Sequence, residues 1–236
     1  MNIVPVERIL YECEQDYIYR TLRENIVSLT LEPGEELSET TIANYFERSR
    51  SPICGALSRL REEHLIVTEP QRKTVVAPFA YDGLKQAGYL RYLLETEMLV
   101  EAVNEGKSDQ LCQTLMDALE AMDAIYSKKD TMGADPLFTR KLRRADKRFH
   151  YSIYEAVGRT LLLEYTQKSI LHYQRLQSLQ RRDEIQEGDF ISHHMDLIKM
   201  VQKKDIAAIQ ERKASRIERL DDVISSAQSA FPEYFE

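Results

Sequence analysis

The segment from Ser38 to Pro78 constrains the fold of this chain more than any other stretch. Its first part places Ile42, Ala43 and Phe46 at the spacing of one buried helical face. Ser38 stands directly before this pattern, and serine is a favoured residue for capping the first turn of a helix. The pattern therefore predicts a short helix that begins after Ser38.

A second helix is predicted to follow closely. Ser51 is suited to cap it, and Pro52 at the first helical position loses no hydrogen bond because that amide would be unpaired anyway. A polar turn over residues 47–50 has the length that joins the two helices of a helix-turn-helix. The core stripe of the second helix is expected to consist of Ile53, Ala56, Leu57 and Leu60.

Two β-branched runs, residues 65–68 and 74–77, come next and predict a hairpin with a cationic tip. Together with the two helices, the hairpin makes a winged helix-turn-helix. In such folds the front of the second helix meets bases and phosphates in the major groove of DNA. We therefore predict DNA contacts from Ser38, Thr40, Arg50, Ser51, Arg59, Arg72 and Lys73.

The charge balance limits how the chain can bind DNA. The net charge is −7, which argues against binding through a generally basic surface. Residues 1–80 contain nine Lys and Arg against thirteen Asp and Glu, although basic residues outnumber acidic ones between residues 40 and 79. The alternative is a winged-helix protein with weakened or lost DNA binding that acts through protein contacts.

The composition favours a reduced, cytoplasmic protein. Apolar runs fall short of the ~18 residues that a membrane span needs, and Pro5 and nearby charges interrupt the N-terminus, so no signal peptide is expected. Cys13, Cys54 and Cys112 are odd in number and lack metal-ligand spacing. We therefore expect neither a disulfide framework nor a zinc ribbon.

The first part of the chain resembles the GntR family of bacterial transcription regulators. The matching residues are Ile18-Tyr19, Leu22-Arg23, Ile26, Leu31-x-Pro33-Gly34-x-x-Leu37-Ser38-Glu39, Ile42-Ala43, Ser49-Arg50-Ser51-Pro52, Ala56-Leu57-x-x-Leu60 and Leu65-Ile66. Two positions that usually carry Arg in this family are Thr40 and Cys54, and the wing lacks the usual Gly. Losing phosphate contacts there should weaken DNA binding and flatten its salt dependence.

Beyond Phe79 the apolar spacing is helical throughout, so the expected fold class is mainly α. We predict a winged helix-turn-helix domain over residues 1–79 and an all-α, six-helix effector-binding and dimerisation domain over residues 82–236. The six helices are expected at about residues 84–106, 108–125, 142–158, 161–181, 189–203 and 205–227. Among them the basic run 140–148 is interpreted as a solvated helix face.

This second part resembles the FCD effector domain of the FadR-type branch of the family. The matching features are Leu90-Arg91-x-x-Leu94-Glu95, Asp146-x-x-x-His150, and His194 followed by Asp205. The resemblance implies a metal site of one Asp and three His, and the third His is Arg216 here. A divalent metal such as zinc at Asp146, His150 and His194 is therefore in doubt, because Arg cannot ligate a metal.

Spacing also brings these residues together. Asp146 and His150, four apart on a helix, share a face, although such a pair alone is more often a buried hydrogen-bonded pair than a binding site. His194 and Arg216 come level across a helical hairpin that turns at residues 203–204. His172 or His193 could in principle supply a replacement ligand.

These patterns lead to one functional hypothesis. We expect a homodimeric transcription regulator that binds an inverted-repeat operator in double-stranded DNA and responds to a small metabolite, a carboxylate because Arg216 suits an acidic ligand. The expected effector residues are Arg91, Asp146, His150, His194 and Arg216. An enzyme is not expected, because no nucleophile, Gly-rich phosphate loop or general-base pair accompanies the site.

Overall fold

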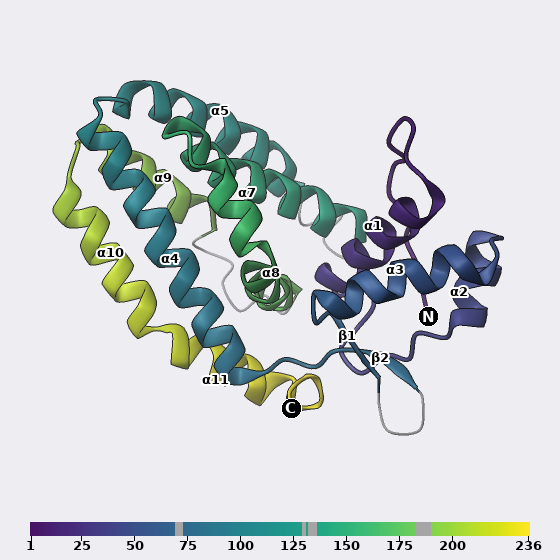
Figure 1. Cartoon of the computed structure of the whole chain (residues 1–236). Helices are drawn as coiled ribbons and strands as arrows, with labels where there is room; N and C mark the ends of the chain where they lie inside the picture. The colour runs from purple at the N-terminus through teal and green to yellow at the C-terminus, as the bar shows by residue number, and fades with distance from the viewer. Residues whose placement is uncertain (69–72, 129–130, 132–135, 183–189) are drawn as a thin grey trace.

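The computed structural model describes residues 1–68, 73–128, 131, 136–182 and 190–236 (Figure 1). One side of the molecule is a reading head, defined as the N-terminal arm of residues 1–13 with everything up to the hairpin. Its elements are α1 (Glu14–Val27), α2 (Glu39–Phe46), α3 (Arg50–Glu62), β1 (Ile66–Thr68) and β2 (Thr74–Val76). The mainly α fold class with a winged helix-turn-helix is confirmed.

The other side is a helical bundle that the chain enters directly after the hairpin (Figure 1). Its elements are α4 (Tyr81–Asn104), α5 (Ser108–Tyr126), α7 (Pro136–Ala156), α8 (Thr160–Arg182), α9 (Phe190–Gln202), α10 (Ile206–Glu218), α11 (Leu220–Ala230) and the 3-10 turn η1 (Pro232–Tyr234). The helix expected over residues 205–227 is wrong in one respect, because it is divided at Arg219 into α10 and α11.

The hairpin of the reading head is antiparallel, with Ile66 paired to Val76 and Thr68 to Thr74. A further bridge joins Glu36 to Val75 on the other side of β2. The predicted apolar stripes of the helices form one buried core beneath the hairpin, with members that include Ile18, Leu22, Ile26, Ile42, Ile53, Leu57 and Leu60. Leu171 of α8 joins the same core, so the bundle packs directly on the reading head.

The N-terminal caps of the helices in the reading head agree only in part with the caps predicted from the sequence. The Ser38 hydroxyl accepts a hydrogen bond from the Thr41 amide at 3.3 Å, so the predicted cap of α2 is confirmed. The predicted cap of α3 is wrong. This helix begins at Arg50 with Ser49 in the cap position, so Ser51 lies inside its first turn.

The main core of the bundle is built from apolar side chains of α4, α5, α7 and α9. The buried side chains include Leu99, Leu111, Leu115, Leu119, Leu142, Phe149, Ile153, Leu197 and Val201. A second core lies where α11 covers α4 and α8, and contains Leu84, Tyr173 and Leu220. The predicted Asp and His residues of α7 and α9 therefore lie at the edge of a closely packed interior.

Replacing either of two glycines of α4 by alanine is expected to change the stability of the fold, in opposite directions. A Cβ at Gly88 would lie 2.6 Å from Cδ2 of Leu220 and 2.9 Å from Cε2 of Tyr173, whereas a Cβ at Gly83 would meet only the Ala80 Cβ, at 3.6 Å. Gly88→Ala should therefore lower the free energy of unfolding by about 1–3 kcal/mol through overpacking. Gly83→Ala should raise it by up to about 1 kcal/mol, because Ala loses less backbone entropy in a helix. Urea unfolding of both variants checks this, and equal effects would contradict the close approach of α4, α8 and α11.

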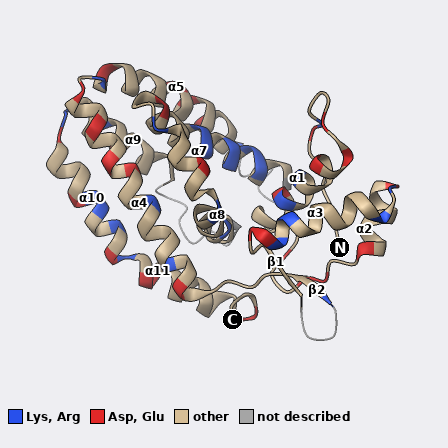
Figure 2. Ribbon diagram, viewed as in Figure 1, with Lys and Arg blue, Asp and Glu red and all other residues tan. Residues whose placement is uncertain are grey.

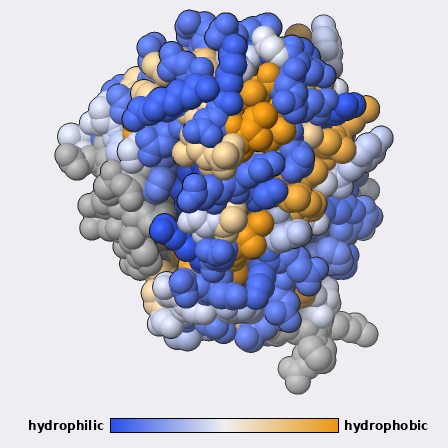
Figure 3. All heavy atoms as spheres, turned by 90° about the vertical axis from the view of Figure 1, so that its left-hand side faces the viewer, coloured by the Kyte–Doolittle hydropathy of each residue, from blue (hydrophilic) through white to orange (hydrophobic). Residues whose placement is uncertain are grey.

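One face of the bundle is mostly hydrophilic (Figure 3). Figure 3 shows the side formed by α4, α9 and α10, where apolar patches lie between hydrophilic ones. Within the described ranges, no helix has both the length and the apolar character to cross a membrane.

Candidate functional site

The exposed face of α3 is the candidate DNA-reading surface. Its outward residues are Arg50, Ser51, Cys54, Ser58 and Arg61. The Arg50 side chain is 77% exposed at the front of the helix, and its guanidinium lies 3.7 Å from the carboxylate of Glu39. Glu62 is also exposed beside Arg61, so the face is cationic at its front, neutral in the middle and of mixed charge at its end.

Arg59 was predicted from the sequence to contact DNA together with Arg50, but its side chain points toward α1. Its guanidinium pairs with Asp16 of α1 and lies 3.7 Å above the ring of Tyr19. The Asp16 carboxylate also accepts a hydrogen bond from the Cys13 thiol at 3.0 Å, and these contacts lower the pKa of Asp16. Arg59 thus supports the packing of α1 on α3 and is not presented with Arg50.

The remaining predicted DNA contacts are spread around the same surface. Thr40 is exposed in the first turn of α2, while the Ser38 hydroxyl is occupied by the helix cap. Lys73 is exposed at the start of β2 and pairs with Glu36 at 3.4 Å. Arg72 lies outside the described residues.

The structure brings three predicted residues of the bundle together. Oδ1 of Asp146 lies 3.1 Å from Nε2 of His194 and 3.6 Å from Nε2 of His150. One donor atom from each residue lies within 4.8 Å of the others. Asp146 and His194 are buried and His150 is half-buried. We call this group the Asp-His-His cluster.

Hydrogen bonding fixes how both imidazoles face Asp146. Nδ1 of His194 lies 2.7 Å from the carbonyl oxygen of Phe190, which can only accept, so this nitrogen carries a proton. Nδ1 of His150 likewise lies 2.7 Å from Oε2 of Glu95. Both Nε2 atoms therefore face the Asp146 carboxylate. Two nitrogen lone pairs beside a carboxylate require a proton or a cation between them.

Glu95 of α4 belongs to the residues that match the FCD domain, but the sequence did not link it to His150. Burial raises the pKa of Glu95, but His150 and then Arg91 outweigh burial and lower the pKa to about 2. Burial lowers the pKa of His150, yet Glu95 and then Asp146 raise it above its usual value. Glu95 is thus an ionised, buried acceptor that holds His150 in place. Its signal in the sequence was its position four residues after Arg91 on a largely apolar helix.

Of two further predicted residues, Arg91 lies close to the cluster and His172 does not. Arg91 is buried, and its Nη1 donates a hydrogen bond to Oε1 of Gln177 on α8 at 2.8 Å. His172, a possible replacement ligand, instead contacts the carbonyl oxygen of Glu63 in the reading head at 3.1 Å. His172 therefore does not join the cluster.

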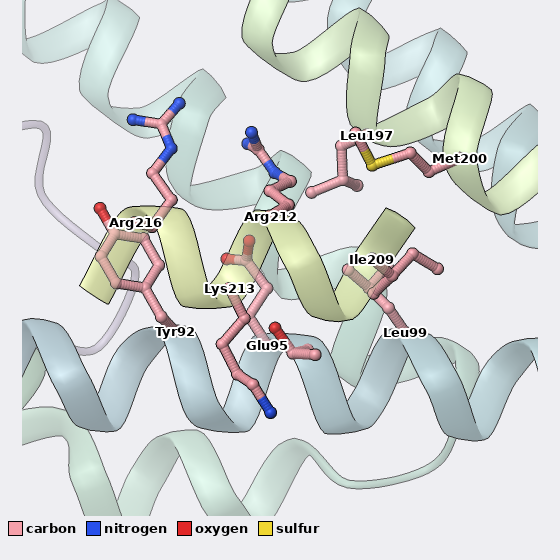
Figure 4. A pocket seen from close by; sticks show the side chains of 10 residues that line it. Tyr92, Glu95, Leu99, Leu197, Met200, Ile209, Arg212, Lys213 and Arg216 are labelled. Carbon is pink, nitrogen blue, oxygen red and sulfur yellow. The ribbon is translucent and has the colours of Figure 1, made fainter. Parts of the chain in front are cut away.

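A small cavity between α4, α9 and α10 adjoins the cluster through Glu95 (Figure 4). Its volume is about 20 Å³, which is little more than one water molecule needs. Arg216 lines this cavity, and so do Arg212 and Lys213 of the same helix. Arg212, which the sequence interpretation did not single out, also donates a hydrogen bond to the carbonyl oxygen of His193 at 3.4 Å. The cavity is therefore strongly cationic.

The donor set partly fits a metal. Two imidazole nitrogens and one carboxylate oxygen are ligands that zinc accepts, and both imidazoles have the fixed outer hydrogen bond that such ligands need. The position expected to provide a further imidazole carries Arg216, whose permanent charge opposes a dication.

The fold and these two sites define a two-domain transcription regulator. Residues 14–76 match the bacterial regulatory proteins of the gntR family, and residues 89–219 match the FCD domain. The chain belongs to the GntR family, in the branch that carries an FCD domain.

Individual relatives agree with this assignment. The chain is 22% identical over 218 residues to the HTH-type transcriptional repressor RspR of Escherichia coli K12, covering 92% of each protein. It is 29% identical over 189 residues to the gluconate operon transcriptional repressor of Bacillus licheniformis, covering 78% of this chain and 74% of that one. These relatives are regulators, so the expectation that the chain is not an enzyme is confirmed.

Solved structures support the same fold. A GntR transcriptional regulator from Rhodococcus sp. RHA1 superposes with a TM-score of 0.72 at 18% identity, covering 90% of this chain and 98% of that one. McbR/YncC of E. coli gives a TM-score of 0.68 at 17% identity, covering 91% and 98%.

Proposed function

We propose that the chain represses transcription as a cytoplasmic homodimer that binds an inverted-repeat operator and responds to a carboxylate metabolite. The observation that carries the proposal is the exposed face of α3 with Arg50 at its front. Residues 1–79 would form the DNA-binding domain and residues 82–236 the effector-binding and dimerisation domain. The apolar patches on the bundle surface in Figure 3 suit a dimer contact, and the two named relatives are repressors.

Arg50 and Ser51 are the proposed contacts to bases and phosphates, because the front of the second helix enters the major groove in this motif. Lys73 is exposed on the wing and would contact phosphate, as would Arg72. Arg59 would have to leave Asp16 to reach DNA. Phosphate contacts position the head, while base contacts specify the operator.

The carboxylate effector would bind at the cavity beside the Asp-His-His cluster. Arg216 and Arg212 supply planar donors that suit a carboxylate, and Arg91 adds a buried positive charge nearby. Because the cavity holds little more than a water molecule, an effector has to displace side chains of α10 or α4 to enter. That displacement gives the ligand a way to change the arrangement of the helices.

Asp146, His150 and His194 are the proposed ligands if a divalent metal such as zinc binds. Arg216 makes tight binding unfavourable in the present chain, so we expect less than one equivalent of zinc in the purified protein. The cationic cavity, and not a bound metal, would then recognise the acidic effector.

Two ion pairs favour a second candidate function, in which the protein acts through protein contacts. Arg48 is held by Glu14 at 2.9 Å and Arg59 by Asp16, which leaves few uncommitted cations on the reading head. A winged-helix protein that acts through protein contacts would show this pattern. Gel-shift titration on DNA upstream of the protein's own gene separates the two, because only a DNA-binding regulator gives a salt-sensitive shift.

Cys54→Arg should strengthen DNA binding. Cys54 is exposed in the neutral middle of the α3 face, so the substitution adds one cation to each head. The slope of log affinity against log salt should steepen by about one for each additional phosphate that the new guanidinium neutralises. Tyr89→Arg on the exposed side of α4 adds the same charge outside the reading head and should leave the slope unchanged. Fluorescence anisotropy at several salt concentrations measures both, and equal slopes would contradict the assigned face.

A further inference from the structure

Helix α7 is in contact with the reading head. The sequence interpretation treated its basic run 140–148 as a solvated face, and this is wrong for two residues, because Arg140 is 7% exposed and Arg143 is 6% exposed. Figure 2 shows the Lys and Arg residues of α7 as a blue band on the part of the helix nearest α1. These two arginines therefore lie in the interface between the bundle and the reading head.

Both arginines contact one carboxylate of the head. Arg143 pairs with Glu24 of α1 through its Nη2 atom, and Nε of Arg140 lies 3.9 Å from the same carboxylate oxygen. Arg140 also donates hydrogen bonds to the carbonyl oxygens of Pro5 and Val4, at 2.8 and 3.0 Å. Arg140 thus holds the N-terminal arm as well as α1.

The arm in turn is fastened to the reading head. The Val4 amide donates to Oδ1 of Asn25 at 2.9 Å, and Nδ2 of Asn25 donates to the Val4 carbonyl oxygen at 2.8 Å. Ile3 is buried in the core of the head, and its carbonyl oxygen accepts a hydrogen bond from Tyr45 at 3.0 Å. The contacts of Arg140 with the arm therefore also hold the reading head in place.

The same helix carries part of the Asp-His-His cluster. Asp146 follows Arg143 by three residues, which is ~4.5 Å along the axis at 1.5 Å per residue. Less than one helical turn thus separates the contact to the head from the Asp-His-His cluster, which adjoins the candidate effector cavity through Glu95. A movement of α7 at the cluster would shift Arg140 and Arg143 with it.

We propose that Arg140 and Arg143 are positioning residues that lock the reading head to α7, so that α7 links the effector site to the placement of the head. The lock is a property of the free protein. Its consequence for DNA rests on the proposed function. Glu24 is the only carboxylate that the two arginines are observed to share in the described part of the chain, so its removal should open the lock.

Hydrogen exchange in the full chain without DNA tests the lock. Glu24→Gln removes the shared negative charge, and Arg140→Lys replaces the two guanidinium nitrogens that reach Val4 and Pro5 by a single ammonium group. Amide exchange in residues 2–6 and 23–27 should therefore accelerate on the order of tenfold. Arg148→Gln is the matched control, because Arg148 lies on the same helix but pairs with Glu155 on the exposed side, at 2.7 Å.

Unchanged exchange in α5 shows that each variant is folded. If the amides of residues 2–6 and 23–27 exchange at the same rate in both interface variants as in Arg148→Gln, the proposed lock is wrong.

A second test measures how operator affinity depends on the spacing between half-sites. A purely structural role of Glu24 would leave this dependence unchanged. A head fixed on the bundle of a dimer should select one spacing between half-sites. Wild type should therefore lose affinity when one base pair is inserted, and Glu24→Gln should discriminate less between the two spacings. Retained discrimination in Glu24→Gln would overturn the positioning role. If wild type binds no inverted repeat, the proposed function fails, while the exchange experiment still decides the lock.

Discussion

Arg50→Ala is expected to lower operator affinity by roughly 10²-fold or more, because the side chain is lost from both heads of the dimer and a good contact of this kind contributes about 1–3 kcal/mol. Arg50 is the most suitable contact on α3, since its side chain is 77% exposed and its nearest partner, Glu39, is also partly exposed, at 3.7 Å. The salt slope should fall as well if Arg50 contacts phosphate. Fluorescence anisotropy with labelled operator DNA measures both quantities.

Arg48→Ala is the matched control for this prediction. Arg48 stands two residues before Arg50 in the same turn, but its guanidinium is held by Glu14 at 2.9 Å. Its removal should change operator affinity far less than the removal of Arg50. Loss of binding in Arg48→Ala with normal binding in Arg50→Ala would show that the front of α3 is not the reading surface.

Arg216→His is expected to raise zinc affinity, by on the order of 10–100-fold, which is the scale on which a supporting group changes a metal site. The substitution removes a permanent cation and restores the imidazole that the resemblance to the FCD domain implies, while the other three donor atoms already lie within 4.8 Å of one another. Competition with a chromophoric chelator gives the affinity, and metal analysis of the purified protein gives the occupancy.

Asp146→Asn in the Arg216→His background provides the control. Asp146 faces both imidazoles, so the gain should vanish when its carboxylate is lost. A full equivalent of zinc in the wild-type protein would contradict the view that Arg216 disfavours metal. In that case the cluster would be a complete metal site despite the substitution.

Local patterns allowed much of the fold to be predicted from the sequence. The stripe of α3 and the Ser38 cap of α2 depend on residues within one or two turns, and both are confirmed. The two short β-branched runs predicted the hairpin, although they did not predict its register. The shared face of Asp146 and His150 also followed from helical spacing, whereas the addition of His194 to this pair followed from the resemblance to the FCD domain.

Contacts between distant segments could not be predicted in the same way. Arg59 and Arg143 look alike as exposed helical cations in the sequence, yet their partners, Asp16 and Glu24, lie on α1 far away in the chain. The role of Glu95 depends on His150, which belongs to another helix. The break at Arg219 has no Gly or Pro to mark it, and it becomes visible only where α11 packs on α4 and α8.

We propose that the head formed by α1 to β2 reads DNA under the control of the bundle behind it. This can be tested by incubating the purified protein with fragmented DNA of its own genome and sequencing the fragments that it retains. We expect enrichment of an inverted repeat, with retention that falls as salt rises and is lost in Arg50→Ala. Retention of no fragment above background at low salt would contradict this proposal and would favour a winged-helix protein that acts through protein contacts.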